Sequence, residues 1–268
     1  MKILAIGDII GRPGRVILER LLIGLREEAA VDLVVANCEN AAGGAGVTPA
    51  IADELFRTGV DVLTSGNHVW KKKEALELLR LDPRVIRPAN YPDGAPGTGS
   101  TVVETLSGQK VGVLNLMGRI FMEPLDCPFR TAQRELERLR LVTSVIVVDM
   151  HAEATSEKVA MGWFLDGKVS CVFGTHTHIP TADERMLPGG TAYITDVGMT
   201  GPYDSVIGRR TDQILERFLS HLPQRSEVAS GNIQLRGLLV EVNPTTGRAT
   251  SVARVTKTLT ESIPGVEP

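Results

Sequence analysis

The stretch "KVSCVFGTHTHIP", residues 168–180, combines a predicted strand with a pair of candidate metal ligands. Residues 168–174 are mostly β-branched and apolar, which favours a buried β-strand. His176 and His178 follow this strand directly, and Pro180 comes soon after them. Two interpretations are open: the histidines are ordinary polar residues, or they complete a metal site whose other ligands lie far back in the chain. The ends of the other predicted strands bear on this choice.

Short apolar strands and amphipathic helical segments alternate along most of the chain. The predicted strands cover residues 2–7, 32–37, 61–66, 101–106, 110–116, 144–150, 168–174 and 191–198. The predicted helices cover residues 13–29, 49–58, 69–79, 130–140, 153–164 and 209–221. This alternation predicts the α/β fold class. Two final β-rich runs, 232–243 and 249–257, are joined by "PTTG" and predict a hairpin, so an antiparallel component is expected as well.

The composition is that of a globular protein with a sizeable core. The chain has 268 residues, of which 43% are apolar and 23% charged, so length alone allows one large domain or two small ones. No internal repeat or linker divides the sequence, and we predict a single domain over residues 1–260 with a loose C-terminal tail at 261–268. The Pro- and Gly-rich stretch 87–100 is predicted to be a long surface loop.

Charge and hydropathy argue against several classes of partner. The 29 basic residues nearly balance the 32 acidic ones, and neither sign forms a block, so nothing indicates a nucleic-acid polymer or a polybasic membrane anchor. No stretch approaches the roughly 20 apolar residues of a membrane span, and Asp8 interrupts the short N-terminal apolar run. Three cysteines without CxxC spacing fit reduced thiols. We expect a cytoplasmic protein that acts on a small molecule and has no membrane partner.

Polar side chains that commonly bind metals follow several of the predicted strands. Of the 5 histidines, His221 alone lies in a predicted helix tail, and the others lie at strand ends. The carboxyl ends of strands in an open α/β sheet converge on one crevice, so residues remote in sequence can meet there. The candidates at these strand ends are Asp8, Glu39, Asn40, Asn67, His68, His151, His176 and His178.

The donor types in this set indicate a transition metal. Imidazole nitrogen combined with carboxylate and amide oxygen suits Zn, Mn, Fe, Ni or Co, whereas an all-oxygen set would suit Mg or Ca. Two ions about 3.5–4 Å apart, bridged by Glu39, could share a hydroxide nucleophile for an in-line phosphoryl displacement. With Asp8, Glu39 and that hydroxide, two divalent ions keep a charge of roughly +1, which attracts a phosphodiester monoanion. No GxSxG nucleophile motif is present, so the residues alone predict metal-dependent hydrolysis of a phosphate ester.

Five ordered motifs resemble those of the calcineurin-like metallophosphoesterase superfamily. They read "GDII", "NCENAAGG", "SGNH", "DMH" and "GTHTH" and span residues 7–178. Two positions depart from the superfamily pattern. Ile10 occupies the position of a histidine ligand in the superfamily, and Glu39 occupies the position of its bridging aspartate. The chain is similar, over nearly its full length, to the bacterial YmdB-type branch, in which an Asn directly follows the bridging Glu. The stretches "SGNHVW", "GTHTHIPTAD" and "DVGMTGPYDSVIG" also resemble that branch.

The resemblance implies a four-layer α/β/β/α sandwich, in which two mixed sheets are flanked by helices. It also implies a dinuclear metal centre and hydrolysis of 2′,3′- or 3′,5′-cyclic nucleotides by a metal-bridging hydroxide. Iron is the metal that the resemblance favours, while Mn, Zn and Co accept the same ligands. The implied ligands of one ion are Asp8, Glu39, Asn40 and His178, and those of the other are Glu39, Asn67, His151 and His176.

Two residues of this set have more than one interpretation. Asn40 is either a direct ligand or a residue that orients Glu39. His68 is implied to be the general acid that protonates the leaving alkoxide, or a donor to a phosphate oxygen, and the alternative is a support for Asn67. The Gly-rich stretch 198–208 is either a loop on the substrate side or a turn.

Alternative functions remain open at this point. One is a phosphomonoesterase or nucleotidase that uses the same metals. Another is a metal-binding regulatory protein with slow turnover, an alternative kept open by Ile10 in place of the usual histidine. A homo-oligomer is compatible with the sequence.

Overall fold

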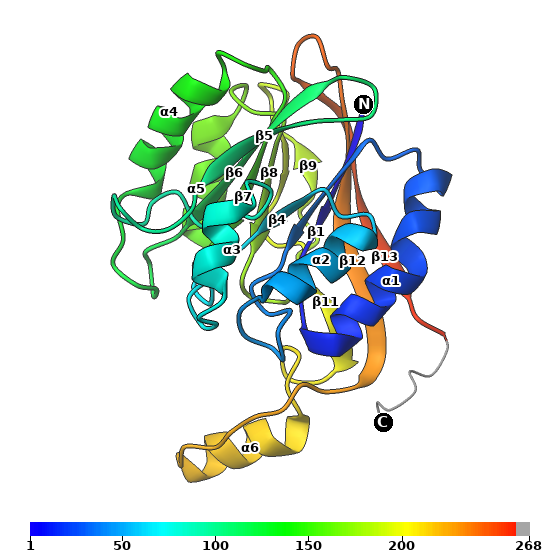
Figure 1. Ribbon diagram of the computed structural model, residues 1–268, viewed down its shortest axis with the longest axis vertical. Coiled ribbons are helices and arrows are strands. Elements are labelled where there is room, and N and C mark those ends of the chain that lie inside the picture. Colours follow the sequence, from blue (N-terminus) through cyan, green and yellow to red (C-terminus); the bar gives the residue numbers. More distant parts are fainter. Residues whose placement is uncertain (261–268) are drawn as a thin grey trace.

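The computed structural model describes residues 1–260 and contains two mixed β-sheets stacked face to face (Figure 1). The predicted tail at 261–268 lies outside the described residues. Across the first sheet the strands are β2 (Asp8–Ile9), β11 (Met199–Asp204), β12 (Gly231–Val242), β1 (Lys2–Ile6), β3 (Leu33–Asn37) and β4 (Val62–Thr64), with β13 (Ala249–Thr258) paired to β12. β1, β3 and β4 run parallel, whereas β12 and β13 form the antiparallel hairpin that the sequence predicts.

The second sheet is built from the middle of the chain. Across it the strands are β5 (Ser100–Glu104), β6 (Lys110–Met117), β7 (Ile146–His151), β8 (Cys171–Thr175), β10 (Ala192–Ile194) and β9 (Arg185–Met186). The four central strands run parallel, and β5 and β9 are antiparallel edge strands. Parallel central strands place their carboxyl ends at one edge of the sheet.

Helices cover the outer face of each sheet, which gives the four layers seen in Figure 1. The helices on the first sheet are α1 (Gly11–Glu28), α2 (Pro49–Arg57) and α3 (Ala75–Leu81), and those on the second are α4 (Pro128–Leu139) and α5 (Thr155–Leu165). The predicted four-layer sandwich of two mixed sheets is therefore confirmed. Among residues 1–260, no helix has the length and hydropathy that a bilayer crossing requires.

Strand periodicity explains the three hydrophobic cores that separate these layers. Successive side chains of a strand point to opposite faces of its sheet. In β1, Ile3 and Ala5 belong to the core between the two sheets, which also contains Phe173 of β8. Leu4 and Ile6 belong instead to the core beneath α1. The third core lies between the second sheet and its helices. Because both faces of the central strands are buried, their sequences are apolar almost throughout.

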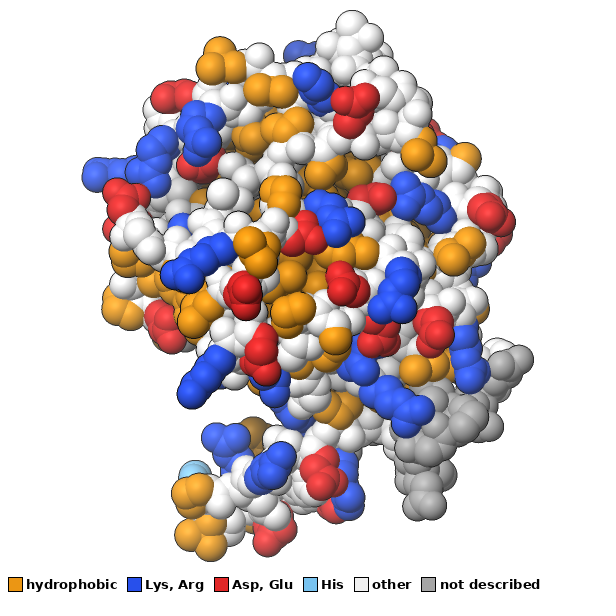
Figure 2. All heavy atoms as spheres, in the orientation of Figure 1, with side chains coloured by type: hydrophobic (Ala, Val, Ile, Leu, Met, Phe, Trp, Pro, Cys, Tyr) orange, Lys and Arg blue, Asp and Glu red, His pale blue; other side chains and the backbone are white. Residues whose placement is uncertain are grey.

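The last helix, α6 (Thr211–Ser220), extends away from the four layers (Figure 1). A β-bridge between Arg209 and Val228 closes the base of this arm. Leu215, Phe218 and Leu219 of α6 are exposed, and Figure 2 shows hydrophobic side chains at the far end of the arm. The arm therefore contributes little to the cores that hold the sheets together.

One predicted helix and one predicted loop differ from the structure. The helix predicted at 69–79 begins only at Ala75, because residues 67–74 form turns and bends at the end of β4. The basic residues 71–73 lie inside the predicted helix but precede the observed one. The stretch 198–208, predicted to be a loop or a turn, contributes β11 to the first sheet. Its Gly and Pro content does not indicate a strand. The register of β11 is instead fixed by pairing with β12, which is distant in sequence.

Part of the predicted surface loop at 87–100 is buried. Arg87 folds its guanidinium back onto the carbonyls of Pro88 and Pro96, and Asn90 binds the backbone of Met117 through both its amide nitrogen and its oxygen. These bonds satisfy backbone groups that a buried loop would otherwise leave unpaired. The prediction of a surface loop is therefore wrong for the first residues of this stretch.

Candidate metal centre

The eight candidate residues meet at the carboxyl ends of strands from both sheets. The first sheet and the loops that follow its strands supply Asp8, Glu39, Asn40, Asn67 and His68, and the second supplies His151, His176 and His178. The cluster exists only because the two sheets are stacked with these ends on the same side of the molecule.

One half of the cluster is centred on His151, which is fully buried at the end of β7. Its Nε2 lies 3.3 Å from Glu39 Oε2, 3.0 Å from Asn67 Oδ1 and 3.1 Å from His176 Nδ1. The ligand atoms of Glu39, His151 and His176 all lie within 4.8 Å of one another. Nitrogen and oxygen donors that converge in this way suit a cation held at bond lengths of about 2.0–2.2 Å.

The family resemblance assigns Asp8, Asn40 and His178 to the other half of the cluster. His178 Nε2 lies 4.0 Å from Asp8 Oδ1, and His151 Nδ1 lies 3.9 Å from the same oxygen. Asp8 Oδ1 and Asn40 Oδ1 are buried and have no hydrogen-bond partner among the described residues. A buried oxygen without a partner costs about 1–3 kcal/mol, so an additional positive group is expected beside these two atoms. The donors present here therefore fit a metal ion.

His68 lies at the edge of the cluster and is partly exposed. Its backbone N–H donates to Glu39 Oε2 at 2.9 Å, and its Nδ1 lies 3.2 Å from Glu39 Oε1. The same Nδ1 lies 3.0 Å from Asn40 Nδ2. The imidazole thus touches the Glu39 carboxylate, which also lies beside His151, while part of its surface stays open to solvent. This position suits a group that exchanges protons with a bound molecule.

Burial and close packing set the protonation states in the cluster. Burial opposes ionisation of Glu39, but His151 and His68 outweigh it and hold the pKa of Glu39 well below its usual range. Burial also opposes charge on His151, yet Glu39 and Asp8 raise the pKa of His151 to about 9. Burial and the neighbouring His151 lower the pKa of His176 to about 3. His176 is therefore the neutral imidazole that metal binding requires.

Two residues that the sequence analysis does not identify orient His151. Its Nδ1 lies 2.9 Å from Thr175 Oγ1, and the Thr175 hydroxyl donates to Asp149 Oδ1 at 2.7 Å. When one ring nitrogen of a histidine is held by such a hydrogen bond, the other ring nitrogen is oriented toward a metal. The sequence does carry a signal for Asp149, because this carboxylate interrupts the apolar run of β7 and is fully buried.

The other two histidines also have outward partners. His178 Nδ1 lies 2.9 Å from the carbonyl oxygen of Ile207, to which a ring N–H can donate. His176 Nε2 lies 3.1 Å from Glu153 Oε2 at the rim of the site. The Ile207 carbonyl carries no sequence signal, since every residue has one. Glu153 follows His151 closely in sequence, and that spacing is the only hint of its role.

Unusual backbone geometry lets these groups approach one another. His176 and His178 have left-handed backbone conformations, with φ of 95° and 66°. Such conformations cost of order 1–3 kcal/mol each in residues other than glycine and are found at functional sites. Gly66 precedes Asn67, and a Cβ at Gly66 would collide with His151 Nε2 and with Glu39 Oε2. No side chain fits at position 66 without breaking the cluster.

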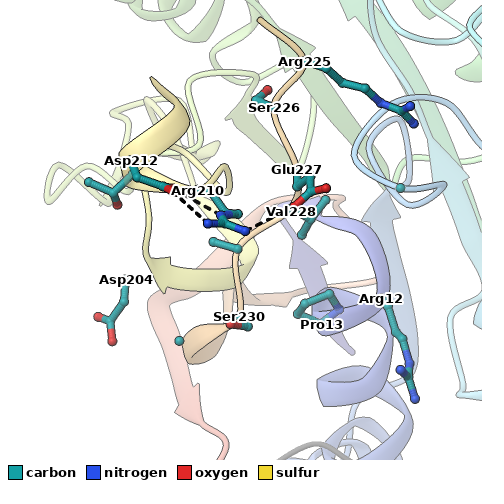
Figure 3. A pocket seen from close by; sticks show the side chains of 14 residues that line it. Arg12, Pro13, Asp204, Arg210, Asp212, Arg225, Ser226, Glu227, Val228 and Ser230 are labelled. Atoms are coloured by element: carbon teal, nitrogen blue, oxygen red, sulfur yellow. Dashed lines mark hydrogen bonds and ion pairs between the residues drawn. The ribbon is translucent and has the colours of Figure 1, made fainter. Parts of the chain in front are cut away.

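A separate cavity of about 1030 Å³ lies at the base of α6. None of the eight candidate residues lines it. Figure 3 shows Arg210 directed toward Asp212 and Glu227, to whose carboxylates its guanidinium pairs at 2.7 and 3.4 Å. Asp212 and Glu227 therefore compensate the charge of Arg210, and the cavity is distinct from the cluster at the strand ends.

Two stacked mixed sheets flanked by helices give this chain the fold of a solved phosphatase, and Asp, Glu, Asn and His side chains cluster at its strand ends. More narrowly, the chain belongs to the YmdB-like protein family, whose model matches residues 4–255. The resemblance drawn from the sequence motifs is therefore confirmed.

Relatives and solved structures agree with this membership. Over 255 residues the chain is 45% identical to the 2′,3′-cyclic-nucleotide 2′-phosphodiesterase of Bacillus subtilis (strain 168), covering 95% of this chain and 96% of the relative. A hypothetical protein from Thermus thermophilus has a similar structure, with a TM-score of 0.90, 42% identity and coverage of 96% of this chain and 99% of that one. A novel phosphatase from Mycoplasma pneumoniae also has a TM-score of 0.90, with 35% identity and coverage of 96% and 93%.

Proposed function

We propose that this protein is a dinuclear metal-dependent phosphodiesterase that hydrolyses 2′,3′- or 3′,5′-cyclic nucleotides. The observation that carries the proposal is the pair of buried oxygens, Asp8 Oδ1 and Asn40 Oδ1, that lack partners among the described residues inside a cluster of nitrogen and oxygen donors. The cyclic-nucleotide class is supported by the Bacillus subtilis relative, whose similarity covers 95% of this chain.

The proposed ligands divide between the two halves of the cluster. Asp8, Glu39, Asn40 and His178 hold one ion, and Glu39, Asn67, His151 and His176 hold the other, with Glu39 shared. The contacts of Asn40 favour direct ligation over a supporting role. Its Nδ2 donates to the Gly44 carbonyl at 3.1 Å, which leaves its orphaned Oδ1 as the atom available to a cation.

Bound ions would supply two things: a water acidic enough to be deprotonated near neutral pH, and positive charge beside the phosphate oxygens. The residues of the chain do the rest. Thr175 and Ile207 hold the rings of His151 and His178, so that the metal-facing nitrogens are fixed before substrate arrives. His68, at the edge of the cluster, donates a proton to the leaving alkoxide oxygen of the substrate.

Iron is the proposed native metal, on the strength of the family resemblance, although Mn, Zn and Co suit the same donors. Metal supply in the cell decides among ions with such similar preferences. We propose the cytoplasm as the site of action, because a cyclic nucleotide substrate would be found there.

The experiment that tests this function joins elemental analysis to a substrate panel. Freshly purified protein is analysed for Fe, Mn, Zn and Co, and is then assayed with both classes of cyclic nucleotide, p-nitrophenyl phosphate and bis(p-nitrophenyl) phosphate. We expect about two ions per chain and faster hydrolysis of the diesters than of the monoester. Preference for the monoester would replace the proposal with a phosphomonoesterase. A fully loaded protein that turns over none of these compounds would favour a regulatory role instead.

A further inference from the structure

A buried ion pair lies behind the candidate metal centre and includes none of the proposed ligands. Lys158 of α5 and Asp196, in the loop after β10, are both about 1% exposed. Lys158 Nζ lies 2.6 Å from Asp196 Oδ2. Burying two charges is costly unless additional hydrogen bonds satisfy both groups, so a pair of this kind by itself is weak evidence for stability. Its other bonds indicate what the pair does.

The other side-chain bonds of the pair go to the chain around His176 and to the loop of Asp196. Lys158 Nζ donates to the carbonyl of Thr175 at 2.7 Å. Asp196 Oδ2 accepts from the backbone N–H of Thr177 at 3.2 Å and from its hydroxyl at 2.8 Å. Asp196 Oδ1 accepts from the N–H of Gly198 at 2.8 Å. The residues immediately before and after His176 are therefore fixed by one ion pair.

The turn that is fixed in this way is the one with unusual backbone geometry. Both histidines of the 175–178 turn have positive φ, and the intervening Thr177 is held by Asp196. The strand that leads into this turn is also tightly packed, because a Cβ at Gly174 would collide with the backbone carbonyl of Thr195 and lie 2.9 Å from Lys158 Cδ. A relaxed turn would move the rings of His176 and His178 away from Glu39 and Asp8.

We propose that Lys158 and Asp196 are positioning residues that clamp the 175–178 turn in the conformation needed for metal binding. The clamp acts on both halves of the metal centre, because His176 belongs to one half and His178 to the other. This inference rests on the proposed function, since it assigns the pair a role toward the metals. An ion pair suits the task because its geometry specifies the positions of Thr175 and Thr177, which apolar packing would not do.

The test measures metal binding in variants that keep side-chain volume. Lys158→Met and Asp196→Asn remove one charge each, and the double variant removes both. Apo proteins are titrated with Mn²⁺, and Co²⁺-loaded proteins are compared by their visible absorption, which reports the geometry of the coordinating groups. We expect Mn²⁺ affinity to fall about 10–100-fold, as it does when groups that orient metal ligands are lost, and the Co²⁺ spectrum to change.

A matched control is available near the opposite edge of the second sheet, beside β5. Glu135 of α4 is a buried carboxylate that accepts from the Ser100 hydroxyl at 2.7 Å and contacts no candidate ligand in the described residues. Glu135→Gln should lower thermal stability without changing Mn²⁺ affinity or the Co²⁺ spectrum. If the charge variants of the pair fail to fold, Thr177→Val decides the matter, because it removes the 2.8 Å bond to Asp196 and leaves both charges in place.

The outcomes separate this inference from the function on which it rests. Wild-type protein that binds Mn²⁺ and Co²⁺ while the folded variants bind both ions with unchanged affinity and spectrum would overturn the clamp alone. Wild-type protein that binds neither ion would overturn the proposed function, and the clamp with it. Loss of Mn²⁺ affinity with a changed Co²⁺ spectrum in the variants, but not in Glu135→Gln, would support the clamp.

Discussion

The backbone N–H of His176 donates to Asp8 Oδ2 at 3.1 Å, across 168 residues of chain. This bond joins the two sheets at the candidate metal centre. It occupies one oxygen of Asp8 and leaves Oδ1 without a hydrogen-bond partner among residues 1–260. The same contact therefore closes the site and orients one of its proposed ligand atoms.

Replacing His68 by Ala should reduce turnover of cyclic nucleotides while both metals stay bound. A general acid contributes about 10²–10⁴-fold to the rate when the leaving group is a poor one, such as a ribose alkoxide. Bis(p-nitrophenyl) phosphate releases a stable phenolate that needs little protonation, so the variant should lose much less activity on it. Steady-state assays with both substrates, together with metal analysis, check this. His221→Ala, at the exposed end of α6, is the control, and equal losses on both substrates would exclude the general-acid role.

Replacing Glu39 by Gln should weaken the binding of both ions. The substitution keeps the size of the side chain but removes the charge that lies beside His151 and His68. Because Glu39 is the proposed bridge, the loss should exceed the ~10–100-fold typical of residues that only orient ligands. Isothermal titration with Mn²⁺ measures it. A variant that retains two ions and normal turnover would show that another group bridges the metals.

Replacing Arg209 by Ala should loosen the loop that holds Asn40. Arg209 Nη2 donates to the Gly44 carbonyl at 2.6 Å, and Asn40 Nδ2 donates to the same oxygen at 3.1 Å. Arg209 does not bond to a proposed ligand; it bonds to the carbonyl that holds Asn40. Groups that bond directly to metal ligands typically contribute about 10–100-fold to metal affinity, so for Arg209→Ala we expect a loss of about 10-fold. Arg210→Ala is the matched control, since its guanidinium pairs with Asp212 on the surface. Equal metal affinity in the two variants would contradict the prediction.

Removing the metals with a chelator should lower thermal stability. An ion that binds only the folded state adds about 4 kcal/mol when its free concentration is 1,000 times its dissociation constant. Differential scanning calorimetry of chelated and reloaded protein measures the difference. Re-addition of Mn²⁺ should restore the melting temperature, whereas Ca²⁺ should restore little of it because imidazole ligands do not suit that ion.

Asp183 should make the free energy of unfolding depend on pH in the acidic range. Burial raises its pKa, but bonds from the Thr181 hydroxyl and from Thr195 outweigh this and lower the pKa below the ordinary 3.8. A carboxylate with a lowered pKa stabilises the fold above its unfolded pKa, and that contribution is lost as the pH falls through the folded value. Asp183→Asn should therefore be less stable than wild type at pH 7, with the difference shrinking below pH ~4. Urea unfolding across this range is the measurement, with exposed Asp93→Asn as control.

The sequence predicts most elements of the fold because each has a local signal. Apolar runs mark the strands, and amphipathic periodicity marks α1 and α4. β11 is missed because Gly201 and Pro202 are poor strand formers, and only pairing with β12 makes the segment extended. The start of α3 is misplaced for a related reason, since residues 67–74 adopt the turns that place Asn67 and His68 at the site.

The sequence by itself determined the candidate residues, since metal-binding side chains at successive strand ends are visible as residue types and positions. Tertiary structure alone decided which of them face one another. Glu39 meets His151, His178 is held by Ile207, and Lys158 with Asp196 fixes the turn between the two histidines. The physical reason is that strand periodicity specifies the face on which a side chain lies. The stacking of two sheets, with contacts between residues distant in sequence, sets the distances and hydrogen bonds that orient each ligand.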